Sequence, residues 1–392
     1  MSEWRKGVLS DIAIITMGQS PKGETCNNDG NGLPLLNGPT EFGLSHPIPT
    51  QFTEDPKRIA EIGDVLFCVR GSTTGRMNWA NQKYAIGRGI ASIRYKSNQY
   101  NSFIYHLLNY RLPYLLGIAT GSTFPNVSKD HLNELPVNIP DNANMEIINS
   151  ILFNLDQKIN LLHQQNQTLE ELAQTLFKRW FVDFEFPNEN GEPYKSSGGK
   201  MIASELGEIP EGWEISTIGD ITINHDKLRK PLSKNQRLKK QGVYPYHGAT
   251  SIMDFVDDYI FDGKYLLLGE DGSVVDENGY PYLQYVKGKF WVNNHAHVLE
   301  GKGSITTDYL YLLLSKTNIS NIVTGAVQLK INQGNLNSIE VILPSKTVLE
   351  SFNLLMSPIF SKIFNQKTEI QSLTKLRDTL LPKLMNGELK IN

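Results

Sequence analysis

The sequence predicts an α+β protein in which two tandem mixed α/β domains are joined by two long antiparallel coiled-coil helices. Two observations lead to this fold class. The chain carries one unit twice, about 200 residues apart, and each copy is followed by a long segment with a heptad pattern. A length of 392 residues, with 40% apolar and 20% charged residues, suffices for two or three globular domains with sizeable cores.

The duplication is clearest in segments 119–140 and 323–344, which share a Thr-Gly pair, a Leu-Asn pair and a final proline at matching positions. The likeness extends upstream to segments 102–108 and 308–314. Solenoid repeats have periods of roughly 20–50 residues, so the longer period here indicates duplication of a whole domain.

Each copy predicts the same order of elements. Short β-rich runs bounded by Gly and Asn come first, then a short helix, a Thr-Gly loop and a closing strand that ends at Pro140 or Pro344. The expected strands are 64–70, 89–95, 265–269, 284–286 and 290–292, and the expected helices are 102–110 and 307–315.

Both copies are followed by apolar residues at alternating three- and four-residue spacing, which is typical of a coiled coil. In the first segment the d positions are Ile148, Leu155, Leu162, Leu169 and Leu176, and the a positions are Leu152, Ile159, Asn166, Ala173 and Trp180. In the second, the a positions are Leu349, Met356, Ile363, Ile370, Arg377 and Leu384, and the d positions are Phe352, Ile359, Gln366, Leu373 and Leu380.

Two polar details of the helices lead to separate expectations. Antiparallel pairing brings Asn166 near Gln366, where a polar contact would fix the register; alternatively, both amides point to solvent. Pro358 lies inside the second run and is expected to kink or restart that helix, because proline lacks the N–H and clashes with the preceding turn.

These patterns divide the chain into five parts. They are a first domain (1–141), a central helix (142–185), a linker (186–212), a second domain (213–344) and a C-terminal helix (345–392).

Composition restricts the class of protein. No run approaches about 18 apolar residues, so no transmembrane helix is expected, and the N-terminus has no apolar signal region. Two cysteines without a CxxC pair fit a reducing cytoplasm. The net charge of −3 counts against DNA binding, unless charge is unevenly placed or a partner supplies part of a basic groove.

The common catalytic motifs are absent from the sequence. There is no Pro-Pro pair for an amino-methyltransferase loop, no P-loop, no HExxH, no GxSxG and no deaminase signature. His295 and His297 fall on one face of an expected strand, but no obvious third metal ligand is near, so no metal site is assigned. Glu270 and Asp271 form a carboxylate pair in a Gly-bounded loop, which could do acid–base work. A turn, or acceptance of a hydrogen bond from cytosine N4, fits Asp271 at least as well.

Loops at corresponding places in the two copies have the composition of DNA-contacting loops, because hydroxyls and cations suit phosphates and Arg, Asn and Gln suit base edges. The basic run 225–240 adds a phosphate-facing loop. The candidate DNA-binding residues are Ser72, Thr73, Arg76, Lys83, Arg88, Ser122, Thr123, Asn126, Lys129, Lys227, Arg229, Lys230, His247, Asp271, Ser273, His295, Gln328, Lys330 and Asn332. No catalytic residue is assigned.

Three phrases resemble the specificity subunits of type I restriction-modification systems. They are the segments 176–185 (LFKRWFVDFE), 200–213 (KMIASELGEIPEGW) and 381–389 (LPKLMNGEL). The resemblance covers essentially the whole chain, including its duplication.

The resemblance implies a circularly arranged, pseudo-twofold, non-catalytic cytoplasmic subunit with two target-recognition domains, each reading one half of a bipartite asymmetric site in double-stranded DNA. The helices would set the spacer and dock two methyltransferase subunits, and restriction subunits would join to form an ATP-dependent endonuclease. S-adenosylmethionine, ATP and Mg would bind those partners. The helix residues expected in this assembly are Leu155, Leu162, Asn166, Leu169, Trp180, Ile363, Gln366 and Leu373.

Two other classes remain open from the residues alone. A stand-alone enzyme acting on nucleic acid would methylate DNA without partners, and a coiled-coil scaffold would bind no DNA at all.

Overall fold

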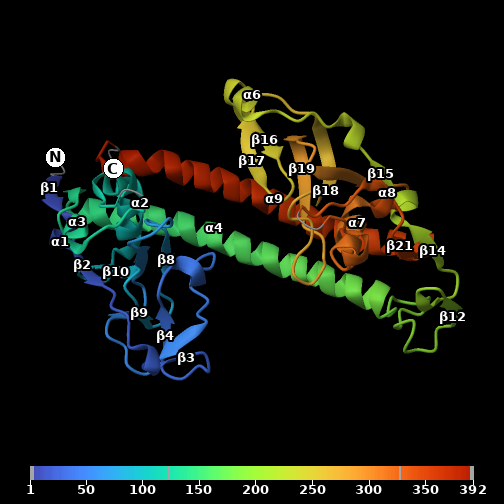
Figure 1. Ribbon diagram of the computed structural model, residues 1–392, viewed down its shortest axis with the longest axis horizontal. Helices are drawn as coiled ribbons and strands as arrows, with labels where there is room; N and C mark the ends of the chain where they lie inside the picture. The colour runs from blue at the N-terminus through green and yellow to red at the C-terminus, as the bar shows by residue number, and fades with distance from the viewer. Residues whose placement is uncertain (1–3, 122–123, 326–327, 389–392) are drawn as a thin grey trace. The chain divides into compact units, whose positions relative to one another are not determined.

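A computed structural model describes residues 4–121, 124–325 and 328–388. The chain forms two compact units: the first comprises Met1–His163 and Thr368–Asn392, and the second comprises Gln164–Lys367. Each unit holds one α/β domain and part of each of two long helices, α4 (Asn142–Phe177) and α9 (Lys346–Met385) (Figure 1). Domain and helix pair therefore pack together within each unit.

The first unit contains two larger sheets and a two-stranded one. The sheet orders are β2-β10-β7-β8, β3-β5-β4-β9-β6 and β1-β11. The strands are β1 (Arg5–Val8), β2 (Ala13–Met17), β3 (Cys26–Asn27), β4 (Leu33–Leu36), β5 (Gln51–Thr53), β6 (Ile59–Ala60), β7 (Val65–Cys68), β8 (Met77–Trp79), β9 (Tyr84–Ile86), β10 (Ile90–Tyr95) and β11 (Pro136–Ile139). The helices are α1 (Leu9–Ile12), α2 (Asn101–Ile118) and α3 (Lys129–Asn133), with 3-10 turns at Gly23–Thr25 and Pro39–Glu41.

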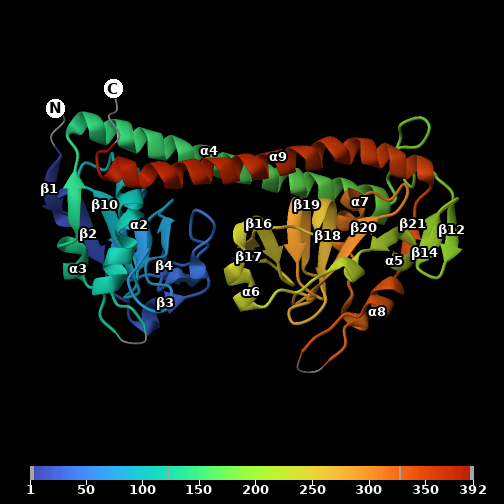
Figure 2. The same cartoon turned by 90° about the horizontal axis from the view of Figure 1, so that it is seen from above.

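The second unit repeats this plan around one six-stranded sheet of order β15-β20-β18-β19-β16-β17, which Figure 2 shows beside the helix pair. The pairs β14-β21 and β12-β13 complete it. The strands are β12 (Met201–Ser204), β13 (Gly207–Pro210), β14 (Glu214–Thr217), β15 (Thr222–Asn224), β16 (Gln241–His247), β17 (Ile252–Val256), β18 (Phe261–Gly269), β19 (Leu283–Val292), β20 (Ala296–Gly301) and β21 (Glu340–Leu343). The helices are α5 (Ile218–Ile221), α6 (Lys234–Lys239), α7 (Thr307–Leu314) and α8 (Gln333–Asn337), with 3-10 turns at Asp226–Leu228 and Ser320–Ile322.

One long strand explains why the second unit has one sheet where the first has two. β19 pairs with β18 along its first part and runs parallel to β16 at its end. In the first unit the same two roles fall to β8, which pairs with β7, and β9, which runs parallel to β4. The expected strands 284–286 and 290–292 are therefore a single strand, which passes through Gly288 at a φ of +99°.

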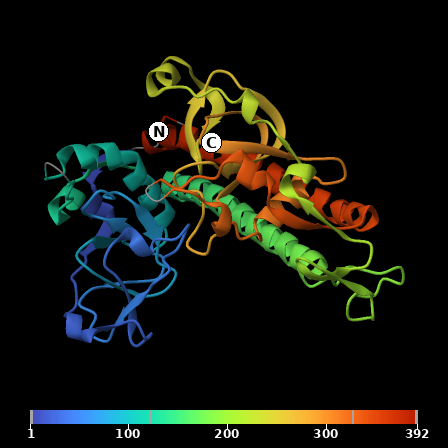
Figure 3. The same ribbon diagram turned by 45° about the vertical axis from the view of Figure 1, so that its right-hand side comes forward.

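The halves of α4 and α9 run antiparallel in both units. In the first unit Asp156 pairs with Arg377 and Lys158 with Glu369. In the second unit Gln165 bonds Gln366, and the Trp180 ring packs on Phe352, with 5.4 Å between ring centroids. Figure 3 shows the two helices running beside each other within the second unit.

The heptad assignment is confirmed by burial. All five a positions of the first segment (Leu152, Ile159, Asn166, Ala173 and Trp180) are buried, and the five d positions are buried or half-buried. α4 ends in a π-helical turn at Lys178–Val182, which leaves the rings of Trp180 and Phe181 in the second unit's core with Phe352.

The polar pair in the helices is buried, so the solvent-facing alternative is wrong. Asn166 is 8% exposed and Gln366 is 6% exposed. However, the Gln366 amide donates to the Gln165 carbonyl at 2.5 Å instead of bonding Asn166. The oxygens of Asn166 and Gln366 find no hydrogen-bond partner among the described residues, which is costly for buried polar atoms.

The helix does not restart at Pro358, because α9 is one helix from Lys346 to Met385. Pro358 lies on the exposed face of the helix, one turn after Leu354, which is 78% exposed. Water can hydrate the Leu354 carbonyl that proline leaves without its usual partner, so the helix continues.

Within the described parts of the chain, no helix combines the length and the apolar character needed to cross a bilayer.

Candidate nucleic-acid interface

Three segments of the first domain meet in a small backbone frame at the ends of β7 and β10. The Val69 N–H donates to the Gly89 carbonyl at 2.9 Å, and the Val127 N–H donates to the Val69 carbonyl at 2.8 Å. The Gly71 N–H donates to the Pro125 carbonyl at 3.2 Å. We call this arrangement the loop frame.

The second domain contains the same loop frame. The Glu270 N–H donates to the His295 carbonyl at 2.8 Å, the Ile331 N–H to the Glu270 carbonyl at 2.8 Å, and the Gly272 N–H to the Leu329 carbonyl at 2.9 Å. Each bond has its counterpart in the first domain at the corresponding residue.

In both copies, two residues six positions apart in the sequence pair through their backbones and close the frame. Thr120 and Asn126 exchange two backbone hydrogen bonds of 3.1 and 2.8 Å, and Thr324 and Lys330 exchange two of 2.8 and 2.7 Å. The described glycines of these turns, Gly121 and Gly325, have φ values of +104° and +91°, which favour glycine.

The side chains on this common backbone differ at several corresponding positions. Corresponding positions pair Arg70 with Asp271, Arg88 with Asn294, Gly89 with His295, Phe124 with Gln328 and Asn126 with Lys330. One backbone with exchanged side chains is the arrangement expected of two modules that bind related ligands with different specificity.

The predicted residues of the first domain take several roles. Ser72, Thr73, Arg88 and Lys129 are exposed, Lys83 is exposed and pairs with Glu61 at 3.2 Å, and the Asn126 backbone belongs to the loop frame. Ser122 and Thr123 lie outside the described residues.

Arg76 supports a neighbouring loop. Its guanidinium donates to the carbonyls of Pro39 at 3.3 Å and Phe42 at 2.9 Å, and it lies 6.0 Å from the Phe42 ring centroid. Arg76 thus fixes the segment that follows β4.

The second domain holds a buried ionic network beneath its loop frame. Arg229 donates to Glu270 at 2.6 Å and lies 3.5 Å from an oxygen of Asp226. His297, which is 1% exposed, contacts Asp226 at 2.6 Å through Nδ1 and the Ile331 carbonyl at 2.8 Å through Nε2. The network ties the 3-10 turn at Asp226 to the frame.

The charges of this network stabilise one another. Burial alone would raise the pKa of Asp226, but the hydrogen bond and charge of His297, together with Arg229, hold it below its ordinary value. Burial would lower the pKa of His297, but its bond to Asp226 and the nearby Glu270 raise it. The carboxylate of Asp226 and the ring of His297 thus each favour the charged form of the other.

The same network tests the possibility of a metal site. Asp226, Glu270 and His297 place ligand atoms within 4.8 Å of one another. Both ring nitrogens of His297 already contact acceptors, and the Arg229 guanidinium binds the two carboxylates. A metal ion would have to displace that cation and deprotonate His297, so the residues do not fit a metal site.

His295 faces outward from the frame, unlike His297. Its Nδ1 contacts Asp271 at 2.6 Å, and its side chain is 45% exposed. Lys330 lies 3.6 Å from Glu270 and is 52% exposed. The Lys330 cation, the His295 imidazole and the Asp271 carboxylate thus all lie around this frame.

The other predicted residues of the second domain divide between surface and interior. Lys227, Lys230, Ser273 and Gln328 are exposed. Asn332 is also exposed, but its side-chain oxygen caps α8 by accepting a hydrogen bond from the Asn335 N–H at 2.7 Å. His247 is buried, with Nδ1 2.8 Å from Gln284, and its burial lowers its pKa.

Sequence reasoning missed two exposed side chains of the first loop frame, Arg70 and Phe124. Phe124 is 57% exposed beside the Pro125 carbonyl that binds Gly71. The available signal was the pair of phrases Arg70-Gly-Ser and Asp271-Gly-Ser, which follow β7 and β18.

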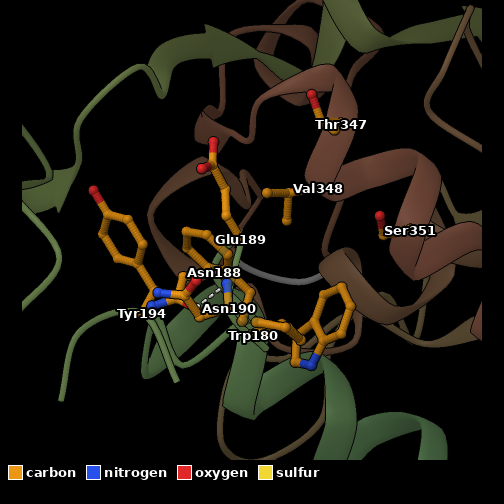
Figure 4. A pocket seen from close by; sticks show the side chains of 10 residues that line it. Trp180, Asn188, Glu189, Asn190, Tyr194, Thr347, Val348 and Ser351 are labelled. Carbon is orange, nitrogen blue, oxygen red and sulfur yellow. Dashed lines mark hydrogen bonds between the residues drawn. The ribbon is translucent and has the colours of Figure 1, made fainter. Parts of the chain in front are cut away.

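A hollow of about 690 Å³ in the second unit lies away from the frame, between residues 186–194 and the first turns of α9. Figure 4 shows Tyr194 at the left of the hollow, Trp180 at the lower right, and Thr347, Val348 and Ser351 above Trp180. Glu189 is the one titratable carboxylate that lines it, and no nucleophile–base pair is among its lining residues. The hollow suits docking better than chemistry.

The fold and loop frames define a class of protein: a two-module binding subunit with one backbone frame carried twice and equipped differently. The family model described as the type I restriction modification DNA specificity domain matches residues 1–171 and 210–377. The chain therefore belongs to this family.

Relatives and a solved structure agree with this membership. The chain is 29% identical to the type I restriction enzyme MjaIX specificity subunit of Methanocaldococcus jannaschii, over 99% of this chain and 94% of that protein. It is 25% identical to the HindI specificity subunit of Haemophilus influenzae, over 85% and 88%. The S subunit structure from M. genitalium has the same fold, with a TM-score of 0.63 at 18% identity over 98% and 96% of the two chains.

Proposed function

We propose that this chain is the sequence-specific DNA recognition subunit of a type I restriction-modification complex, with one half of a bipartite asymmetric site read by each domain. The observation that carries the proposal is the loop frame, which is built twice on one backbone with different side chains. Two equal frames would read the same bases, whereas these present Arg70 and Arg88 in one copy and Asp271 and His295 in the other.

The chain supplies no chemistry in this proposal. S-adenosylmethionine, ATP and Mg are proposed to bind the partner subunits, with adenine methylation and DNA cleavage carried out there. The proposed location is the cytoplasm.

Two methyltransferase subunits are proposed to dock, one on each unit. Exposed leucines support this, since Leu172 of α4 and Leu376 of α9 occupy corresponding places in the repeat and are 45% and 47% exposed. Phe153 adds to the first unit and Leu355 to the second. Apolar side chains on a helix pair suit a partner's amphipathic helix.

Selection from a random DNA library by the complex assembled with its methyltransferase partners tests the function. The expected product is one sequence with two short conserved blocks and a spacer of fixed length. A chain that methylates DNA alone would be an enzyme, and a complex without sequence preference would leave the chain a scaffold. Either result overturns the proposal.

A further inference from the structure

Two arginines lie just beyond the ladder of β7 and β10, one after the end of β7 and one before the start of β10. In that ladder Cys68 pairs with Ile90, and the Val69–Gly89 hydrogen bond continues it by one step. One residue further along the two strands' backbones lie Arg70 and Arg88. The antiparallel ladder therefore leads two like charges to the same end of the sheet.

Neither arginine is neutralised. Both are exposed, and among the residues that the structure describes neither side chain has an acidic or hydrogen-bonding partner. Like charges at opposed positions of a ladder are unfavourable. Arg76 of the same domain, by contrast, binds two carbonyls.

The matched place in the second domain has the opposite character. There Gly269 pairs with Ala296, the Glu270–His295 bond continues the ladder, and Asp271 follows. Asp271 is an acceptor with one oxygen bound to His295 at 2.6 Å and with a side chain that is 20% exposed. The same place in the fold therefore carries two hydrogen-bond donors, Arg70 and Arg88, in the first domain and an acceptor, Asp271, in the second.

A guanidinium that is free, exposed and held at the end of a strand suits a base edge. Arginine donates in a fixed fork that matches O6 and N7 of guanine in the major groove, whereas a carboxylate accepts from an exocyclic amino group. Contact with a DNA phosphate would explain either arginine. It would not explain the acidic residue at the matched position of the second domain, because a carboxylate repels phosphate.

We infer that Arg70 is a specificity-determining residue that reads a guanine in the first domain's half-site, and that Asp271 reads a base with a major-groove amino group in the other half-site. The inference rests on the proposed function and deepens it. Arg88 reinforces the positive potential beside Arg70.

The test measures base preference at every position of the selected site with the assembled complex of wild-type, Arg70→Ala and Arg70→Lys chains. Arg70→Ala is expected to lose about ten- to a hundredfold preference for guanine at one position of one half-site. Arg70→Lys keeps the charge without the fork, so it should retain the salt dependence of binding and still lose most of that preference. Replacing that guanine by 7-deazaguanine should weaken the wild-type complex but leave Arg70→Ala unaffected.

The second arm and the control separate the possible failures. Asp271→Asn should change preference at one position of the other half-site, where cytosine or adenine is the expected base. Lys96→Ala removes an exposed cation at the far end of β10 and should leave the preference profile unchanged. Uniform weakening by Arg70→Ala with rescue by lysine would make Arg70 a phosphate contact and overturn the inference, as would a lost preference for any other base. A wild-type complex that selects no bipartite site would instead refute the proposed function.

Discussion

His297 shows how a single buried side chain can hold a loop frame together. One of its ring nitrogens faces the Asp226 carboxylate and the other faces the Ile331 carbonyl. Only the imidazolium form donates from both nitrogens. The protonated ring therefore joins the turn at Asp226 to the segment that enters α8.

The raised pKa of His297 predicts a pH-dependent stability. A raised folded-state pKa adds stability that is complete below the unfolded value of about 6.5 and is lost as pH rises through the folded value. The pKa of Asp226 is depressed in the folded state, so the stability that this carboxylate contributes is present above about pH 4 and is lost as the pH falls further. The pair should therefore stabilise most between about pH 4 and 6.5.

His297→Gln should lower the free energy of unfolding by about 1.5–3 kcal/mol in that window, and by less at alkaline pH. Urea unfolding of both chains across this pH range measures the difference. His163→Gln, at a half-buried histidine of the first unit, is the control, because it makes the same substitution outside the network of Asp226. Parallel curves for the wild type and His297→Gln would show that the ring is neutral in the folded protein.

At the scale of elements, the two copies pack their helices by different chemistry. In the first unit His106 contacts Asp156 at 2.7 Å, and Arg377 contacts the same carboxylate at 3.0 Å. The corresponding residues of the second unit are Leu312, Phe360 and Ala173, which are buried apolar side chains. One copy thus uses a largely buried ionic cluster where the other uses apolar packing.

This exchange predicts the behaviour of two variants. Asp156→Ala leaves His106 and Arg377 without their shared partner, so it should destabilise the chain by about 3–5 kcal/mol. The triple variant His106→Leu, Asp156→Phe and Arg377→Ala should recover most of that loss, because the second unit already packs these side chains.

Chemical unfolding of the full chain measures both variants. Asp378→Ala is the matched control: it removes the more exposed carboxylate on Arg377 and should cost less than about 1 kcal/mol. If the triple variant were as unstable as Asp156→Ala, apolar packing could not replace the ionic cluster in the first unit, and the prediction would be wrong.

The elements also mark how far the sequence could predict the structure. Heptads predict burial well, because the side-chain period alone decides which face of a helix is covered, and this holds even at Asn166 and Gln366. The choice of Gln165 as the partner of Gln366 depends on rotamers and was not predictable. The sheet around β4 and β9 was missed because strands of two to four residues have too few positions to show alternation.

The candidate site was predicted in part for a related reason. Most of the predicted loops do lie on or near the loop frames, since Gly and hydroxyl residues mark turns in any fold. Arg70 was missed because the repeat shifts by one residue before the frame: matching Gly63 to Gly263 sets Arg70 against Glu270 instead of Asp271. The Gly-Ser pair that follows both Arg70 and Asp271 was the sequence signal for the true correspondence, which the backbone hydrogen bonds establish.

At the scale of the whole molecule, the helices are continuous across the boundary between the units. α4 passes from the first unit to the second between His163 and Gln164, and α9 passes back between Lys367 and Thr368. If each domain reads one half-site, the length of these helices should determine the spacer that the complex prefers. This role is a prediction that a change of length can test.

Seven residues inserted between Leu155 and Leu176, with a matching seven around Gln366, keep every a and d position in phase and lengthen both helices by about 10 Å. B-DNA rises about 3.4 Å per base pair, so the preferred spacer should grow by about three base pairs, with weaker binding because the half-sites also rotate about the DNA axis. Selection from a library with all spacer lengths measures the change. Inserting the heptad in α4 alone is the control, since it puts the two helices out of register and should weaken folding without defining a new spacer. An unchanged spacer in the double insertion, with both half-site sequences retained, would show that the distance between half-sites is set outside these helices.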